Sequence, residues 1–157
     1  METTGTAASS AVYPDPAQLL RTWFEEVWNQ GHVESIDKLF PEHAVMWGVV
    51  RPDVPSTGPA EFKQFYHTMR AACPDIHIAL EHVVLEDDMA FARWTATMTH
   101  TGDGLGMPPT ARKIKVCGMS ALRARDGEIL EGWNNWDQVG LARQLGVLDG
   151  KTAELFR

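Results

Sequence analysis

Residues 113–137 have the sequence KIKVCGMSALRARDGEILEGWNNWD, and this stretch decides the fold class. Apolar and polar side chains alternate on both sides of Arg125-Asp126-Gly127-Glu128. An Asp-Gly pair between two alternating segments is a strong hairpin signal. The pattern therefore predicts two long antiparallel strands, Lys113 to Arg125 and Glu128 to Asp137.

The same alternation extends toward the N-terminus. It predicts strands from Ile76 to Glu86 and from Met89 to His100, joined by a short turn. Thr101 to Arg112 is rich in glycine and proline and too irregular for a tight turn, so we expect a long loop over one rim of the sheet. Four consecutive strands then form an antiparallel meander.

Helical spacing, caps and breakers place the remaining elements before and after these strands. The expected elements are a helix from Pro16 to Trp28 capped by Asp15, a helix from Val33 to Phe40, a strand from His43 to Val50, a helix from Thr57 to Cys73 and a terminal helix from Gln138 to Leu145. Helices followed by a meander indicate an α+β fold, with a bent antiparallel sheet wrapped around the N-terminal helices and a hollow between them. We expect a disordered tail over residues 1–13 and a single domain over 14–157.

Composition limits the classes of partner. The 157 residues suffice for one domain with a buried core, and 14 basic against 21 acidic residues give a net charge of −7. That charge makes nucleic acid and anionic membranes poor partners and favours a neutral or weakly polar small molecule. We expect a cytoplasmic protein, because no signal peptide or membrane span is evident. Cys73 and Cys117 are predicted to be buried free thiols.

The end of the last predicted strand carries the first catalytic candidates. Strict alternation places on one side of that strand Ile129, Glu131, Trp133, Asn135 and Asp137, and on the other side Leu130, Gly132, Asn134 and Trp136. A carboxylate beside indole rings in a hollow loses hydration and becomes a useful general base, so Asp137 is the leading candidate. Asn135 is a candidate donor to an oxyanion. The alternatives are that Asp137 caps the following helix and that Asn135 is a satisfied strand-end amide.

Aromatic side chains are the candidates for a ligand-binding wall. The first candidates are Trp133 and Trp47, and the next are Trp23, Trp94 and Tyr66. The alternative for each of them is packing in the core. His100, at a strand end, is a candidate donor to a carbonyl or a second proton carrier, and its alternative is a surface histidine or one that anchors the glycine-rich loop. Arg93 and Arg112 are alternatives for holding a carboxyl oxygen, or else form surface ion pairs. The spacing of the histidines gives no metal site, so no bound metal is expected.

Several short motifs together resemble one family. They are Trp94-Thr95, Thr99-His100-Thr101-Gly102, Gly106-Met107-Pro108-Pro109-Thr110, Asp126 to Glu131, Trp133 to Asp137, Gly140-Leu141 and Gln144-Leu145-Gly146. In order and spacing, from about Pro16 to Gly146, the chain resembles the SnoaL-like polyketide cyclases of the NTF2-like superfamily. The first strand departs from the family pattern, because Val45-Met46-Trp47-Gly48 stands where a histidine is frequent.

The resemblance implies a cone-shaped α+β barrel with an apolar pocket at its open end. It also implies closure of a polyketide ring by intramolecular aldol condensation without metal or cofactor, with Asp137 at the position of the family's acid/base. Two other hypotheses keep the fold: an epoxide hydrolase or dehydratase, and a small-molecule-binding module without catalysis. A homodimer or larger homo-oligomer is expected because the outer face of such sheets commonly pairs.

Overall fold

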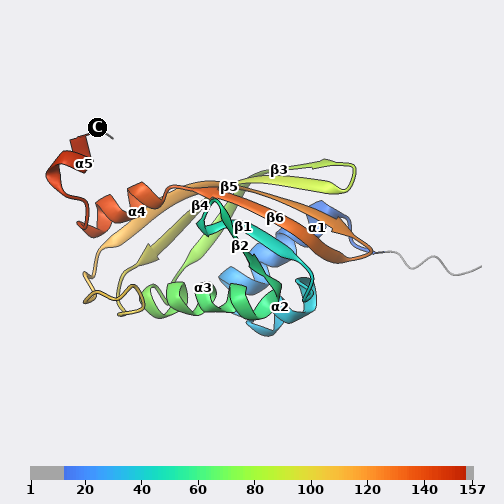
Figure 1. Ribbon diagram of the computed structural model, residues 1–157, viewed down its shortest axis with the longest axis horizontal. Helices are drawn as coiled ribbons and strands as arrows, with labels where there is room; N and C mark the ends of the chain where they lie inside the picture. The colour runs from blue at the N-terminus through green and yellow to red at the C-terminus, as the bar shows by residue number, and fades with distance from the viewer. Residues whose placement is uncertain (1–12, 155–157) are drawn as a thin grey trace, which may run out of the picture.

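Six strands form one curved, open sheet in the computed structural model, which describes residues 13–154 (Figure 1). The elements in chain order are α1 (Pro16–Thr22), the π-helix η1 (Trp23–Asn29), α2 (Glu34–Leu39), β1 (Val45–Arg51), β2 (Val54–Thr57), α3 (Gly58–Ala72), β3 (His77–Glu86), β4 (Met89–Thr99), β5 (Lys113–Arg125), β6 (Glu128–Trp136), α4 (Gln138–Leu145) and α5 (Gly150–Glu154). The predicted tail over residues 1–13 falls almost entirely outside the described residues, and so does the end of the chain.

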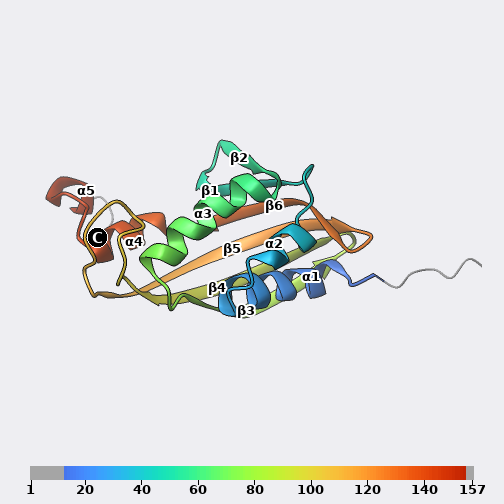
Figure 2. The ribbon, with the colours of Figure 1, turned by 90° about the horizontal axis from the view of Figure 1, so that it is seen from below.

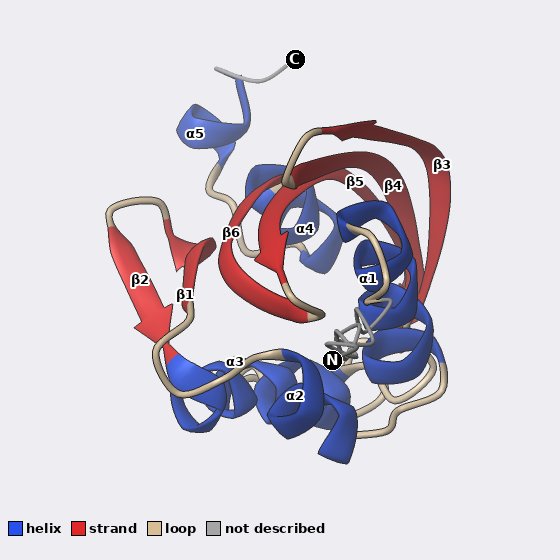
Figure 3. Cartoon of the chain, turned by 90° about the vertical axis from the view of Figure 1, so that its right-hand side faces the viewer, coloured by secondary structure: helices blue, strands red, loops and turns tan. Residues whose placement is uncertain are grey.

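The strand order is β2-β1-β6-β5-β4-β3, and β1 and β6 pair in parallel while the other neighbours pair antiparallel. The sheet curves around α1, and α2 and α3 lie across its open side (Figures 2 and 3). The α+β class and the bent sheet around N-terminal helices are thus confirmed. The sheet does not close on itself, because β2 and β3 remain as edges.

Local signals explain most element boundaries. Asp15 caps α1 by accepting from the Gln18 backbone N at 2.8 Å, and Gln18 returns a bond to the Asp15 backbone, which is a complete capping box. Gly146 ends α4 in the left-handed conformation, with φ of 79°. β5 and α4 have the predicted bounds, and β3, β4 and β6 differ from them by one residue at one end.

Three features differ from the expectations. The first helix continues as the π-helix η1 from Trp23 onward, because backbone bonds there join residues five apart, such as Gln30 N to Glu25 O at 2.8 Å. The short edge strand β2 was missed because its four residues include Pro55. The helix α5 was also not predicted.

The strict alternation expected along β6 is wrong at one place. Arg123 pairs with Glu131 while the next residue, Ala124, pairs with Ile129, so Leu130 is the extra residue of a β-bulge. Ile129 is therefore buried, at 1% exposure, on the same side as Gly132 rather than on the side of Glu131. From Glu131 to Trp136 the alternation holds, and Asn134 and Trp136 are the side chains that face the cavity.

Candidate functional site

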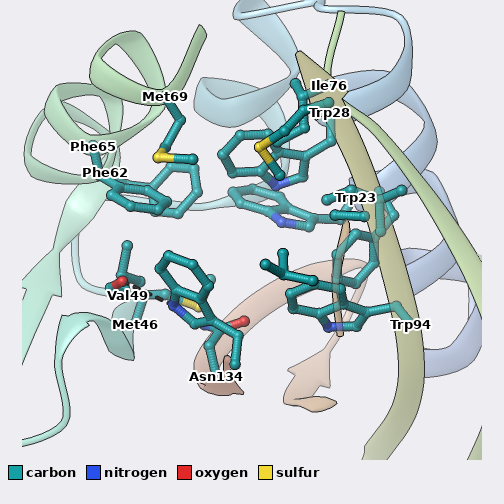
Figure 4. Close-up of a pocket in the computed structure, with 16 residues that line it drawn as sticks. Trp23, Trp28, Met46, Val49, Phe62, Phe65, Met69, Ile76, Trp94 and Asn134 are labelled. Carbon is teal, nitrogen blue, oxygen red and sulfur yellow. Dashed lines mark hydrogen bonds between the residues drawn. The ribbon is translucent and has the colours of Figure 1, made fainter. Parts of the chain in front are cut away.

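A cavity lies between the concave face of the sheet and the helices η1 and α3 (Figure 4). Its empty volume is about 590 Å³, part of it open to solvent. The side chains that line it are Trp23, Phe24, Trp28, Met46, Val49, Phe62, Phe65, Met69, Ile76, Ile78, Trp94, Ala96, Met98, Val116, Asn134 and Trp136. None of these described lining residues is ionisable, so the cavity is suited to a neutral, apolar, ring-bearing ligand.

The π-helix sets the aromatic wall of the cavity. Because π-type bonding relates residues five apart, Trp23 and Trp28 come to the same face of η1 and both line the cavity. The ring centroids of Trp23 and Phe62 are 5.0 Å apart, and those of Phe65 and Trp136 are 6.5 Å apart. These tilted contacts are favourable ring geometries, so the wall is packed before any ligand enters.

Asn134 is the polar side chain of this wall. Trp94 Nε1 donates to Ser120 Oγ at 2.9 Å, Ser120 Oγ donates to Asn134 Oδ1 at 2.7 Å, and Asn134 Nδ2 donates to the Trp47 carbonyl at 3.2 Å. The direction of this chain is fixed at both ends, since an indole N–H only donates and a backbone carbonyl only accepts. The second hydrogen of Nδ2 has no partner among the described residues and is available to a ligand.

Two glycines make this arrangement possible. Gly118 lies opposite Trp94 in the β4–β5 ladder, and a Cβ there would be 2.4 Å from the indole ring, so only glycine lets the indole lie across β5 toward Ser120. Gly48 has φ of 71°, and a Cβ there would be 1.9 Å from the Asn134 backbone oxygen. The close approach of β1 and β6 at Gly48 therefore also requires glycine.

Asp137 does not line this cavity. It is exposed and caps α4, with Oδ1 accepting from the Gly140 backbone N at 2.7 Å. The desolvated hollow that was expected around its carboxylate is absent. The structure therefore corresponds to the capping alternative, and the physical argument for Asp137 as a general base does not apply.

Asn135, Trp133 and Trp47 also lie away from the cavity, on the convex outer face of the sheet. Asn135 is exposed, and Trp133 and Trp47 are half-buried partners in the β1–β6 pairing. Trp47 Nε1 donates to Glu131 Oε1 at 2.9 Å, and the Arg123 guanidinium stacks over Trp133 at 5.6 Å. The expectation that these two tryptophans line the pocket is wrong, because β6 turns Asn134 and Trp136 inward instead.

The remaining aromatic candidates are placed on the inner side. Trp23 and Trp94 line the cavity as predicted. Tyr66 is buried but lies behind the wall, where its ring packs on Trp28 at 5.4 Å and its hydroxyl accepts from Arg70 Nε at 3.4 Å. Tyr66 thus supports Trp28 and does not line the cavity.

His100 is fully buried at the base of the loop between β4 and β5. Its backbone N donates to Arg112 O at 3.0 Å, and its Nδ1 accepts from the Thr110 backbone N at 3.2 Å, which assigns the ring proton to Nε2. Nε2 has no partner among the described residues. His100 is not a lining residue of the cavity, and its geometry corresponds to the loop-anchoring alternative.

The other polar candidates have structural partners. Arg93 pairs with Glu81 on the outer face, and Arg112 Nη1 donates to Gln144 O at 2.8 Å. Cys73 is buried, and burial raises the pKa of its thiol to about 11, with the charge of Asp75 acting in the same direction. Cys117 is exposed, so the prediction that both thiols are buried is wrong for Cys117.

Sequence reasoning missed Asn134 and Ser120. Asn134 lies on the side of β6 opposite to the one that reasoning from Asp137 favoured, and no signal in the sequence singles out Ser120 of β5. Within residues 13–154 no cluster of three metal-ligating side chains is found, and no helix is long and apolar enough to cross a membrane.

Comparisons with known proteins agree with this architecture. The family model of the SnoaL-like polyketide cyclases matches residues 18–145. Among solved structures, IdmH from Streptomyces antibioticus, a candidate polyketide cyclase, is 26% identical with a TM-score of 0.73, and the match covers 85% of this chain and 100% of IdmH. A SnoaL-like polyketide cyclase from Jannaschia sp. CCS1 is 16% identical with a TM-score of 0.76, covering 92% of this chain and 100% of that one.

AclR from Streptomyces galilaeus, a candidate hydroxylase, has the same fold at 24% identity and a TM-score of 0.74, covering 85% of this chain and 97% of AclR. A search of curated proteins returns no match. The family model spans most of the chain, including the cavity-lining residues of η1, α3, β4 and β6. The chain therefore belongs to the SnoaL-like polyketide cyclase family.

Proposed function

We propose that this protein is a cofactor-free ring-closing enzyme for polyketide-like ketones, and that the Asn134 amide binds the oxygen that becomes negatively charged. The observation that carries the proposal is the position of Asn134. It is the polar side chain in a cavity otherwise lined by aromatic and aliphatic groups, and one of its N–H hydrogens is unpaired among the described residues.

The fixed direction of the hydrogen-bond chain determines what Asn134 offers a ligand. Its Oδ1 accepts from Ser120, and one N–H hydrogen of Nδ2 has no partner among the described residues, so the amide offers a donor to a ligand. A donor in an apolar cavity favours a carbonyl oxygen, and it favours an enolate or alkoxide oxygen more strongly because charge develops there. Asn134 therefore discriminates between ground state and transition state in the direction that accelerates ring closure.

The reaction proposed is an intramolecular aldol addition. A carbon between two carbonyl groups loses a proton to water, and the resulting enolate carbon attacks a distant ketone of the same molecule. The new carbon–carbon bond moves the electron pair of that ketone onto its oxygen, which water then protonates, so the product is an isomer of the substrate. The cavity contributes mainly by holding the two reacting carbons together.

The lining residues also bear on the two alternative functions, an epoxide hydrolase or dehydratase and a binding module without catalysis. Hydration of an epoxide or a dehydration step calls for a carboxylate with a partner across the cavity, and the described lining residues include no carboxylate. A binding module without catalysis is compatible with the same lining. The measured rate of ring closure separates the enzyme from the binding module.

The test uses ethyl 3,7-dioxo-7-phenylheptanoate, whose C2 carbon lies between two carbonyls and forms a six-membered ring by attack on C7. We expect the protein to accelerate ring closure above the buffer rate, with product followed by liquid chromatography. Asn134→Leu should lower kcat by about 100-fold or more, in the range for loss of an oxyanion donor. The matched control is Asn135→Leu, the same change one residue along on the outer face, which should leave kcat within about twofold.

Two outcomes would contradict the proposal. Ring closure at the buffer rate in the presence of saturating protein would leave the binding module as the better description. Acceleration that survives Asn134→Leu would place the oxyanion donor elsewhere.

A further inference from the structure

A second, more open chamber adjoins the cavity. It is bounded by the end of β1, by β2, by one side of α3, by the loop after β4 and by the start of α4, and its empty volume is about 1310 Å³ including solvent at its open side. Val49, Phe65, Met69 and Trp136 line both spaces. These four apolar side chains form a collar where the two spaces meet.

The two spaces differ in chemistry because α3 presents two adjacent stripes. Phe62, Phe65 and Met69 face the inner cavity, while Glu61, Gln64 and Thr68 repeat at the same helical spacing and line the outer chamber. Ser56 from β2 and Gln138 from α4 add further polar groups. One end of a ligand therefore meets aromatic rings and the other end meets hydroxyl, amide and carboxylate groups.

The polar groups of the outer chamber retain hydrogen-bonding capacity. Thr68 Oγ1 donates to Gln64 O at 2.9 Å and keeps its lone pairs. Gln138 Nε2 donates to Val50 O at 3.2 Å, and its Oε1 has no partner among the described residues. The side chains of Ser56 and Gln64 have no hydrogen-bond partner among residues 13–154. Donors and acceptors are thus both present, which suits hydroxyl or amide groups that do both.

Charge in the outer chamber has one sign. Glu61 is the ionisable residue among the described residues that line it, and no lysine or arginine is present in that set. Glu61 Oε2 accepts from the Thr57 backbone N at 2.7 Å, which holds the carboxylate at the start of α3. A ligand carboxylate or phosphate in the chamber would face this negative charge without a compensating cation.

Resting on the proposed function, we propose that the outer chamber is a second subsite of the same ligand, which takes a neutral hydroxyl- or amide-bearing end. Glu61 acts there as a specificity determinant that excludes ligands ending in a carboxylate. The ligand is then an elongated molecule with an apolar ring portion inside the collar and a neutral polar portion outside it.

Three naphthalene probes test this inference by quenching of tryptophan fluorescence. They are 1-methylnaphthalene, 4-(1-naphthyl)butan-1-ol and 4-(1-naphthyl)butyrate, which share the ring and differ in the tail. We expect the alcohol to bind most tightly and the butyrate about tenfold more weakly at neutral pH and low salt. Glu61→Gln should remove most of the difference between alcohol and butyrate, because glutamine keeps an oxygen for Thr57 N but loses the charge.

The control is Glu128→Gln, which removes the same charge from an exposed position at the β5–β6 hairpin and should leave the difference intact. Equal binding of alcohol and butyrate, or a difference unchanged by Glu61→Gln, would overturn the role of Glu61. Equal binding of the alcohol and 1-methylnaphthalene would overturn the second subsite alone. Failure of all three probes to bind would overturn the inner cavity, and with it both this inference and the proposed function.

Discussion

Each face of the sheet carries a hydrogen-bonded cluster that includes a tryptophan. The inner cluster is uncharged, and the outer one is charged and half-exposed. On the inner face, Trp94, Ser120 and Asn134 form an uncharged chain with a fixed direction. On the outer face, Trp47 and Arg123 both donate to Glu131, at 2.9 and 3.3 Å, in a half-exposed charged cluster. Hydrogen bonds shielded from water are costly to lose, whereas exposed ion pairs contribute little. A tryptophan N–H donor thus belongs to an uncharged site on one face and to a charged surface cluster on the other.

The largest effect should come from filling the space beside the inner chain. Gly118→Val places a Cβ and two methyl groups where the Trp94 ring lies, 2.4 Å from the nearest ring atom. The indole must move away from Ser120, and we expect the free energy of unfolding to fall by about 3 kcal/mol. Urea unfolding followed by tryptophan fluorescence measures this change.

The adjacent residue on the outer face provides the control. Met119 is 61% exposed, and Met119→Val should change the unfolding free energy by less than about 0.5 kcal/mol. Equal losses for the two variants would mean that the inner and outer faces do not differ in packing as the structure indicates.

A smaller effect is expected from breaking the inner chain without changing its packing. Ser120→Ala leaves Trp94 Nε1 and Asn134 Oδ1 unpaired in a buried place, which should cost about 2 kcal/mol of unfolding free energy. It should also free the Asn134 amide to turn, so the preference for binding 1-tetralone over tetralin, which lacks the ketone, should shrink. Ala121→Ser, on the outer face, should alter neither quantity, and a preserved ketone preference in Ser120→Ala would show that Ser120 does not position Asn134.

The fold could be predicted from local signals, whereas the face of β6 that lines the cavity could not. Helix caps and turns depend only on neighbouring residues, as at Asp15, Gly146 and the Asp126-Gly127 turn. The start of α1, the end of α4 and the β5–β6 hairpin were therefore predicted with nearly correct bounds. The inward direction of Asn134 depends on how β6 lies between β1 and β5 in the folded sheet, which no local signal within β6 gives. Alternation groups Asn134 with Trp136 and Trp133 with Asn135, but it does not say which group faces inward, and reasoning from Asp137 selected the outward group.

Substitutions of Asp137, the residue after β6, distinguish a catalytic role from a capping role. Their expected effect is smaller still. Asp137→Ala removes the acceptor for Gly140 N and should lower the unfolding free energy by about 1 kcal/mol while leaving the rate of ring closure unchanged. Asp137→Asn, which keeps an oxygen at the cap, should retain most of the stability. A stably folded Asp137→Asn variant without activity would restore the acid/base hypothesis for this residue.

The smallest effect should come from a chemical label on the outer face. Cys117 is exposed on β5, whereas Cys73 is buried and its thiol has a pKa raised to about 11, so very little of it is thiolate at neutral pH. N-ethylmaleimide should therefore add once to the folded protein, at Cys117, and a second time only after unfolding, as mass spectrometry would show. The Cys117 adduct lies on the side of β5 opposite Val116 and Gly118, so it should leave probe binding and ring closure unchanged. An adduct that slows ring closure would mean that a change on the outer face of the sheet is transmitted to the cavity on its inner face.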